Sequence, residues 1–308
     1  MKKIAFIFPG QGSQKVGMGK DFYDNFVTSK KIYDQADELL GYKLTDIMFN
    51  GPFEKLSLTK NSQLAIFVNS IAILSALNEM YPDLKPTICA GLSLGEYSAI
   101  YAAQKLGIKE LIFLIQKRAS LMDEACKKNE GAMAAVLKMK KEDIEDTIQE
   151  FEDLWIANLN TADQTVISGK KSSIEKAQKI LLEKGAKRVV ILDVQGAFHT
   201  PYMKFAEDSL KDEILKTNFL DSSISFIMNV TATRVQDTSY LKTNLIKQVS
   251  STILWEGSIK AIDSEVDLFI EIGSKTLTGM NKKIGIKALS LAVEKVQDLE
   301  ELKNAIEK

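Results

Sequence analysis

Apolar residues along this chain follow two patterns, short continuous runs and helical spacing. The runs at 4–8, 87–91 and 268–272 are rich in residues that favour β-structure, and they predict buried strands of a parallel sheet. Apolar positions three and four apart predict helices over 21–40, 63–80 and 109–126 that pack on this sheet. The remaining pattern predicts strands at 225–230 and 286–291, a loop around Gly279, and helices at 203–215, 241–249, 253–262 and 299–307.

The middle of the chain has a different order of elements. Strands are expected at 131–139, 154–160, 164–168 and 186–194, with helices at 141–151 and 172–183. This βαββαβ order is that of a ferredoxin-like domain. We therefore expect an α/β fold in which residues 1–127 and 196–308 form a large domain with a parallel-sheet core. Residues 128–195 form an inserted small domain.

Composition excludes several classes of partner. The 308 residues include 40 basic and 41 acidic side chains, so no global field attracts nucleic acid or an anionic membrane. The first apolar run stops at Pro9, short of a secretory signal, and the apolar stretch 65–77 is too short to span a membrane. The two cysteines have no metal-ligand spacing, so no metal is expected. We expect a cytoplasmic monomer that binds neither nucleic acid nor membrane.

The segment Gly91-Leu92-Ser93-Leu94-Gly95 lies between a predicted strand and a predicted helix. In this setting G-x-S-x-G forms a nucleophile elbow, in which glycines allow the strand and the helix to approach closely. The helix N-terminus supplies free N–H groups to a developing oxyanion. The pattern also occurs in purely structural turns, but its position favours a catalytic Ser93.

Each of the other candidate residues can also be explained by a purely structural role. His199 is the only histidine and follows a predicted strand, so it is the sole imidazole that could serve Ser93, although single histidines are usually surface or core residues. Arg118 lies on an otherwise apolar helical stripe, where snorkelling or an internal ion pair would explain it. The glycines at 10 and 12 form either a simple turn or a functional loop, and they lack the further motif residues of a nucleotide-binding loop.

Five motifs in the same order connect the chain to a known family. They are Phe8-Pro9-Gly10-Gln11-Gly12-Ser13-Gln14, Gly91-Leu92-Ser93-Leu94-Gly95-Glu96-Tyr97-Ser98-Ala99, Arg118, Gly196-Ala197-Phe198-His199 and Gln248. From residue 3 to about residue 291 the chain resembles the malonyl-CoA:acyl carrier protein transacylases of fatty-acid synthesis. The resemblance implies a hydrolase-like α/β domain with a ferredoxin-like insertion. It also implies malonyl transfer from malonyl-CoA to the phosphopantetheine thiol of acyl carrier protein, through a malonyl-serine intermediate and without a cofactor.

The resemblance assigns roles to these residues. Ser93 would be the nucleophile and His199 its base, with the ring oriented by the backbone carbonyl at Gln248. The backbone N–H groups of Gln11 and Leu94 would hold the oxyanion.

The substrate contacts follow from the same resemblance. Arg118 would bind the malonyl carboxylate through two parallel hydrogen bonds, and Gln63 and Asn160 match positions near the site. Phe198 beside His199 would crowd a 2-methyl branch and disfavour methylmalonyl-CoA. Leu92 stands where many members have histidine, and the proline common after the position of Gln248 is absent.

Two other functions share part of this pattern. A serine acyl hydrolase or thioesterase would use the same serine and histidine, but it would not require Arg118. A non-catalytic acyl-carrier scaffold would have the fold without the chemistry. Two basic pairs, Lys187-Arg188 and Lys282-Lys283, are candidates for docking an acidic carrier protein, and a solvated surface explains them equally well.

Overall fold

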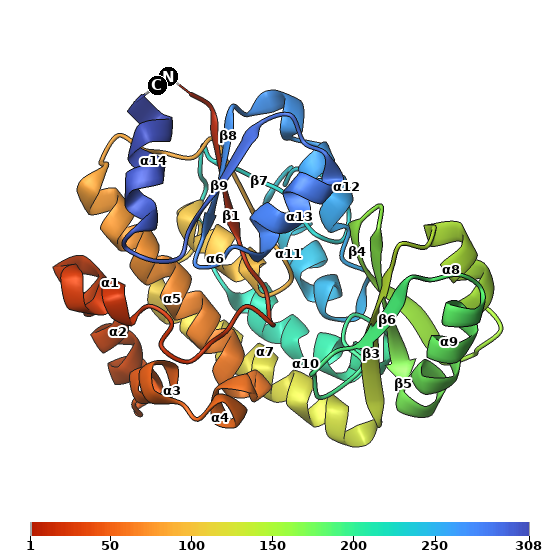
Figure 1. Ribbon diagram of the computed structural model, residues 1–308. Coiled ribbons are helices and arrows are strands. Elements are labelled where there is room, and N and C mark those ends of the chain that lie inside the picture. The colour runs from red at the N-terminus through yellow and green to blue at the C-terminus, as the bar shows by residue number, and fades with distance from the viewer. Residues whose placement is uncertain (1, 308) are drawn as a thin grey trace.

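The computed structural model describes residues 2–307, which form two β-sheets surrounded by helices (Figure 1). The first sheet has the strand order β7-β2-β1-β8-β9, and every pairing in it is parallel. In that order its strands span Ser225–Phe226, Ile88–Gly91, Ile4–Phe8, Leu268–Ile272 and Leu289–Val293. The carboxyl ends of β1 and β2 therefore meet at one edge, where open α/β sheets place their functional loops.

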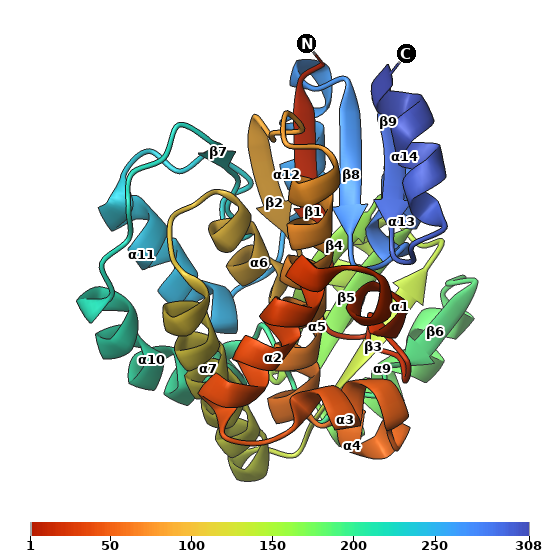
Figure 2. The same cartoon turned by 90° about the vertical axis from the view of Figure 1, so that its left-hand side faces the viewer.

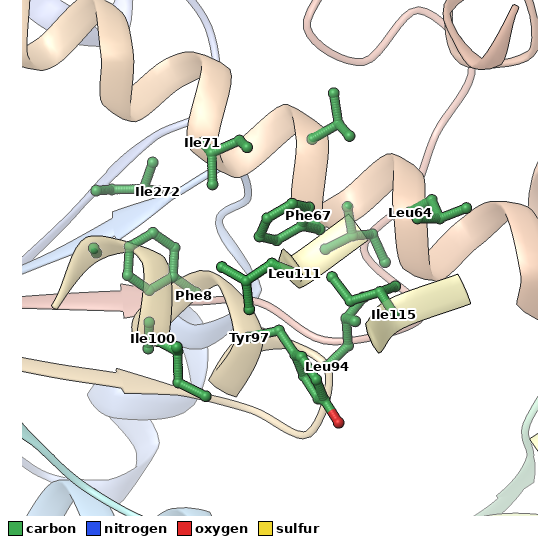
Figure 3. Close-up of a cluster of buried hydrophobic side chains, with 14 of the residues drawn as sticks. Phe8, Leu64, Phe67, Ile71, Leu94, Tyr97, Ile100, Leu111, Ile115 and Ile272 are labelled. Atoms are coloured by element: carbon green, nitrogen blue, oxygen red, sulfur yellow. The ribbon is translucent and has the colours of Figure 1, made fainter. Parts of the chain in front are cut away.

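Helices cover both faces of this sheet because its strands are apolar on both sides. Phe6 and Phe8 of β1 lie in the core on the side covered by α5 (Thr59–Met80), α6 (Gly95–Ala102) and α7 (Ile108–Lys128) (Figure 2). Figure 3 shows Phe8 among apolar side chains of these three helices. The alternate residues Ala5 and Ile7 pack on the opposite side, against α12 (Trp255–Lys260) and α13 (Thr276–Ile284). Such two-sided burial is typical of parallel strands.

The remaining helices form the periphery of this part. They are α1 Lys20–Asn25, α2 Val27–Leu40, α3 Leu44–Asn50, α4 Phe53–Ser57, α10 Lys204–Lys216, α11 Thr238–Lys247 and α14 Asp298–Glu307, with 3-10 helices at Pro201–Met203, Gln248–Ser250 and Asp263–Glu265. The single helix predicted over 21–40 is in fact two helices, α1 and α2, separated at Phe26, whose backbone is extended.

The second sheet is antiparallel and has the order β4-β5-β3-β6. Its elements in sequence are β3 Gly131–Leu137, α8 Lys141–Ile148, β4 Leu154–Thr161, β5 Gln164–Lys170, α9 Lys171–Glu183 and β6 Arg188–Ile191. One face packs on α8 and α9, whereas Met133, Ala135 and Val166 point to the other side, toward the first sheet's helices. The α/β fold with a parallel core and a βαββαβ unit is confirmed, while its exact domain boundaries remain a prediction.

Several predicted elements were wrong in extent. The helix predicted at 63–80 is α5, but it begins four residues earlier and its 22 residues are long enough to span a membrane, contrary to the expectation for 65–77; 78% of its most apolar window is buried inside the protein. It is therefore the central core helix. The strand predicted at 225–230 shrinks to two residues, because the chain leaves the sheet before Asn229.

The region around Gly279 is also different from its prediction. It lies inside helix α13 and not in a loop, and the predicted strand at 286–291 starts only at Leu289. A helical glycine costs only about 1 kcal/mol relative to alanine. Burial of Leu277 and a hydrogen bond of 2.7 Å from the Thr278 N–H to the Glu271 carboxyl offset that cost.

Candidate active site

Ser93 occupies a tight turn between β2 and α6. Its backbone φ is +52°, in the left-handed region that residues other than glycine rarely adopt. A Cβ on Gly91 would lie 2.0 Å from the Gly95 carbonyl oxygen, and one on Gly95 would lie 2.2 Å from the Phe8 carbonyl oxygen. Only glycine fits at either position, so the sequence places the serine at the apex of a compact elbow.

His199 lies directly beside this serine. The Ser93 Oγ is 2.9 Å from the His199 Nε2, and the His199 Nδ1 is 2.9 Å from the backbone carbonyl oxygen of Gln248. A carbonyl can only accept, so Nδ1 carries the proton and Nε2 is free to accept from the serine hydroxyl. The orientation of His199 by Gln248 is thus present without the proline common in the family.

The imidazole is held in its neutral form. His199 is 5% exposed, and burial lowers its pKa to about 3, with the positive charge of Arg118 lowering it further and the Gln248 carbonyl opposing the change. A neutral imidazole is the form that can accept a proton from Ser93. The base is therefore available throughout the neutral pH range.

Arg118 comes from α7 and is 1% exposed. Its Nη1 donates to the Gln63 Oε1 at 2.7 Å, and its Nη2 donates at 3.0 Å to both the Ser93 Oγ and the Gln248 Oε1. The guanidinium also lies 5.6 Å from the centre of the Tyr97 ring. Its hydrogen-bond partners are neutral groups in the interior, so neither snorkelling to the surface nor an internal ion pair explains its position.

Two backbone N–H groups are available next to the serine. Within residues 2–307, the N–H groups of Gln11 and Leu94 have no hydrogen-bond partner, and both residues line the cleft at Ser93. The N–H of Ser93 itself donates to the Asn229 Oδ1 at 2.6 Å. A negatively charged oxygen in the cleft therefore has the Leu94 donor of this turn and the Gln11 donor of the loop after β1, and not the Ser93 donor.

The cleft has a volume of about 220 Å³ and lies between the two sheets. Ser93, His199, Arg118 and Phe198 line one side, while the other side comes from the second sheet and the segment after it, through Met133, Ala135, Asn158, Asn160, Gln164, Val166, Leu192 and Val194. Within the described range, the buried Asn160 Oδ1 has no hydrogen-bond partner. Gln63 lies behind Arg118 and does not line the cleft.

The basic pairs lie apart from the catalytic groups. Lys187 and Arg188 are exposed at the start of β6, and Lys282 and Lys283 are exposed in the last turn of α13. None of the four lines the cleft, although Met280 of α13 does.

Two buried polar residues of the site were not predicted. Asn229 contacts the elbow, and Glu96 accepts hydrogen bonds from the Asn229 backbone N–H and the Gln248 Nε2, each at 2.5 Å. Burial raises the pKa of the Glu96 carboxyl to about 8, against these hydrogen bonds and the charge of Arg118, which lower it. Asn229 could have been noticed in the sequence because it is an asparagine at the end of an apolar run, close to the carboxyl edge of the predicted sheet.

The fold and this arrangement define a class of protein. A serine hydroxyl beside a neutral imidazole, with unpaired backbone N–H groups lining the same cleft, is the constellation of an acyl-transferring serine enzyme. A buried guanidinium 3.0 Å from the serine oxygen adds a place for an anionic acyl group.

Comparison with known proteins gives the family. Residues 5–301 match the acyl transferase domain family. The chain is 40% identical over 306 residues to the malonyl CoA-acyl carrier protein transacylase of Bacillus subtilis (strain 168), covering 97% of this chain and 96% of that protein. The crystal structure of the acyl-carrier-protein-S-malonyltransferase from Bartonella henselae has a TM-score of 0.94 at 34% identity, covering 99% of this chain and 100% of that one.

A third relative is a malonyl-transacylase solved in complex with a type II PKS acyl-carrier protein. It has a TM-score of 0.94 at 31% identity and covers 98% of this chain and 99% of that one. The chain belongs to the acyl transferase domain family and, within it, to the malonyl-CoA:acyl carrier protein transacylases. The resemblance inferred from five sequence motifs is confirmed.

Proposed function

We propose that this acyltransferase moves a malonyl group from malonyl-CoA to the phosphopantetheine thiol of an acyl carrier protein, and so supplies fatty-acid chain elongation. The observation that carries the proposal is the Arg118 guanidinium, buried and 3.0 Å from the Ser93 Oγ. It makes the position beside the nucleophile suitable for an acyl group that ends in a carboxylate. Full-length relatives with this activity in their names support the same conclusion.

The first half-reaction acylates Ser93. The His199 Nε2 removes the hydroxyl proton while the Ser93 Oγ attacks the thioester carbonyl carbon. The carbonyl oxygen becomes an oxyanion that accepts hydrogen bonds from the Gln11 and Leu94 N–H groups. When the C–S bond breaks, the leaving sulfur of coenzyme A takes the proton from His199, which leaves a malonyl ester on Ser93.

The malonyl carboxylate binds Arg118 during this step. The Nε of Arg118 has no hydrogen-bond partner within residues 2–307, so a carboxylate that replaces one of the Nη2 bonds would accept two parallel hydrogen bonds, from Nε and Nη2. The hydrogen bond to Gln63 fixes the plane of the guanidinium. Asn160 supplies a buried amide in the same cleft, whose unpaired Oδ1 can accept from an N–H of the pantetheine arm. Phe198 fills the space beside His199 and disfavours a 2-methyl branch.

The second half-reaction reverses the first with a different thiol. His199 removes the proton from the phosphopantetheine thiol, the sulfur attacks the ester carbonyl carbon, and Ser93 recovers its proton as the C–O bond breaks. Acid–base catalysis and hydrogen bonding account for every step, so we expect no metal and no organic cofactor. We also propose a cytoplasmic monomer, because one chain supplies every group named and both substrates are water-soluble.

The basic pairs remain our candidates for carrier docking. Arg188 pairs with Leu137 across the second sheet, and Leu137 pairs on its other side with the cleft-lining Gln164. Lys282 and Lys283 lie in the same helix as the cleft-lining Met280. Positive charge near two sides of the cleft would attract an acidic carrier protein and orient it toward Ser93.

Intact-mass measurement tests the proposed function. Brief mixing with malonyl-CoA should add one malonyl group to the wild-type protein and none to Ser93→Ala, and added carrier protein with its phosphopantetheine arm should then remove it. Loss of the adduct to water at the same rate without a thiol would identify a hydrolase. A wild-type protein that never forms the adduct would be a non-catalytic scaffold.

A further inference from the structure

The buried residue Asn229 follows β7 and contacts the nucleophile elbow from the neighbouring strand. The β7–β2 ladder has a constant offset: the Ser225 N–H donates to the Thr87 carbonyl at 3.0 Å, and the Ile227 N–H donates to the Cys89 carbonyl at 3.1 Å. The next pair in this register is Asn229 with Gly91. In a parallel ladder the backbone of residue 229 would donate to the Gly91 carbonyl and accept from the N–H of Ser93.

The side chain of Asn229 makes both of these bonds in place of the backbone. Its Nδ2 donates to the Gly91 carbonyl at 2.7 Å, and its Oδ1 accepts from the Ser93 N–H at 2.6 Å. The side-chain amide has the same donor and acceptor groups as a peptide unit, which explains why asparagine suits this position. The sheet pairing thus continues two residues beyond β2, to the nucleophile itself.

The backbone of Asn229 is freed for other contacts. Its N–H donates to Glu96, and its carbonyl accepts from the Leu254 N–H at 2.9 Å. Glu96 also accepts from the Gln248 Nε2, and the Gln248 carbonyl orients His199. One buried network therefore connects the backbone of the nucleophile to the residue that orients the base.

We propose that Asn229 is a positioning residue that holds Ser93 in its left-handed conformation and so directs the Oγ toward His199 and Arg118. A non-glycine residue at φ +52° requires surrounding contacts that outweigh its conformational cost. Asn229 bonds the chain on both sides of Leu92, and it is 0% exposed. The inference rests on the proposed role of Ser93 as nucleophile.

Asn229→Ala removes both side-chain bonds. We expect the rate constant for Ser93 acylation by malonyl-CoA to fall about 10²-fold, the usual effect of a misplaced reacting group, while KM changes by less than about twofold. Asn69→Ala is the matched control, because Asn69 is 1% exposed and its amide bonds to Tyr33 and to the Gly273 carbonyl, outside the cleft. It should lower the Tm by a similar amount and keep the wild-type acylation rate.

A second variant keeps the proposal testable if Asn229→Ala does not fold. In Asn229→Asp, a protonated carboxyl copies the donor and acceptor of the amide, whereas an ionised one cannot donate to the Gly91 carbonyl. Burial and the neighbouring Glu96 raise the pKa of the introduced carboxyl, and Arg118 opposes this. The variant-to-wild-type ratio of acylation rates should therefore rise as the pH falls from about 8 to about 5.

The two proposals can fail separately. A wild-type protein that forms no malonyl adduct overturns the proposed function, and a serine-directed fluorophosphonate then still compares Ser93 reactivity among the variants. Asn229 is merely structural if Asn229→Ala loses thermal stability but reacts as fast as Asn69→Ala. A flat variant-to-wild-type ratio across the pH range for Asn229→Asp would also overturn the positioning role.

Discussion

Replacing Arg118 with alanine should weaken the proposed selectivity for malonyl over acetyl groups. In the variant a malonyl carboxylate would enter a desolvated site without a cationic partner, which costs about 2–5 kcal/mol. An acetyl group has no carboxylate, so among contacts with the reacting groups acetyl transfer loses only the hydrogen bond from Arg118 to the Ser93 Oγ, worth about 1.5–3 kcal/mol because the donor is charged.

The difference between these losses gives the expected change in selectivity. Values of about 3.5 and about 2 kcal/mol leave about 1.5 kcal/mol, or about 10-fold, in the ratio of kcat/KM for malonyl-CoA to kcat/KM for acetyl-CoA. The assay measures transfer of both acyl groups to the same carrier protein by wild type and variant. Arg118→Lys serves as a control, because it keeps the charge but loses the planar pair of donors. Its selectivity ratio should lie between those of the wild type and Arg118→Ala.

Equal losses for the two substrates would refute this reasoning. Arg118 would then be holding the elbow, through its bond to the Ser93 Oγ, or the coenzyme A moiety. A thermal melt of the Arg118→Ala protein separates these cases, since damage to the elbow would also lower the Tm.

Further expectations follow from the site and its surroundings. The acylation rate should not titrate near pH 6.5, because the base must be neutral and its pKa is lowered to about 3; quenched-flow rates that fall with a midpoint of 6–7 would contradict this. Since the charge of Arg118 contributes to that lowering, Arg118→Ala should raise the His199 pKa, which NMR can follow without assignment because the protein has one histidine. Charge reversal at Lys187-Arg188 and Lys282-Lys283 should raise KM for the carrier protein and leave acylation by malonyl-CoA unchanged, and an unaltered KM at low salt would remove the docking proposal. Phe198→Ala should improve methylmalonyl-CoA relative to malonyl-CoA; an unchanged ratio would show that Phe198 does not crowd the branch.

Strong local patterns made much of the fold predictable from sequence. The run at Ile4–Phe8 and the helix now called α7 have periodicities that tertiary contacts reinforce, and both lie close to where the sequence predicted them. The elbow was also recognisable, because Gly91 and Gly95 occupy positions that no other residue fits. Elements whose ends depend on distant contacts were not predictable in the same way, as β7 and α13 show.

In the site, too, residues with local sequence patterns were predictable, whereas contacts between residues far apart in the sequence were not. Ser93, His199 and Arg118 could be selected as candidates from their local patterns and a family resemblance. The partners of Arg118 come from α5 and from the segment after α11, 55 and 130 residues away, and no local pattern records such distances. Asn229 was missed for this reason, since its side chain replaces a backbone pairing that exists only once β7 lies beside β2.

The cleft also has a consequence for how such an enzyme can diversify. Ser93, Leu94 and Gln11 lie in loops at the carboxyl edge of the parallel sheet, and His199 lies between β6 and α10, whereas Met133, Ala135 and Val166 approach from the antiparallel sheet on the facing side. Substitutions at these three apolar positions would reshape the volume open to an acyl chain while the serine, imidazole and guanidinium keep their geometry. Part of the cleft wall is thus encoded away from the catalytic residues, so the space for the acyl chain could change there without altering Ser93, His199 or Arg118.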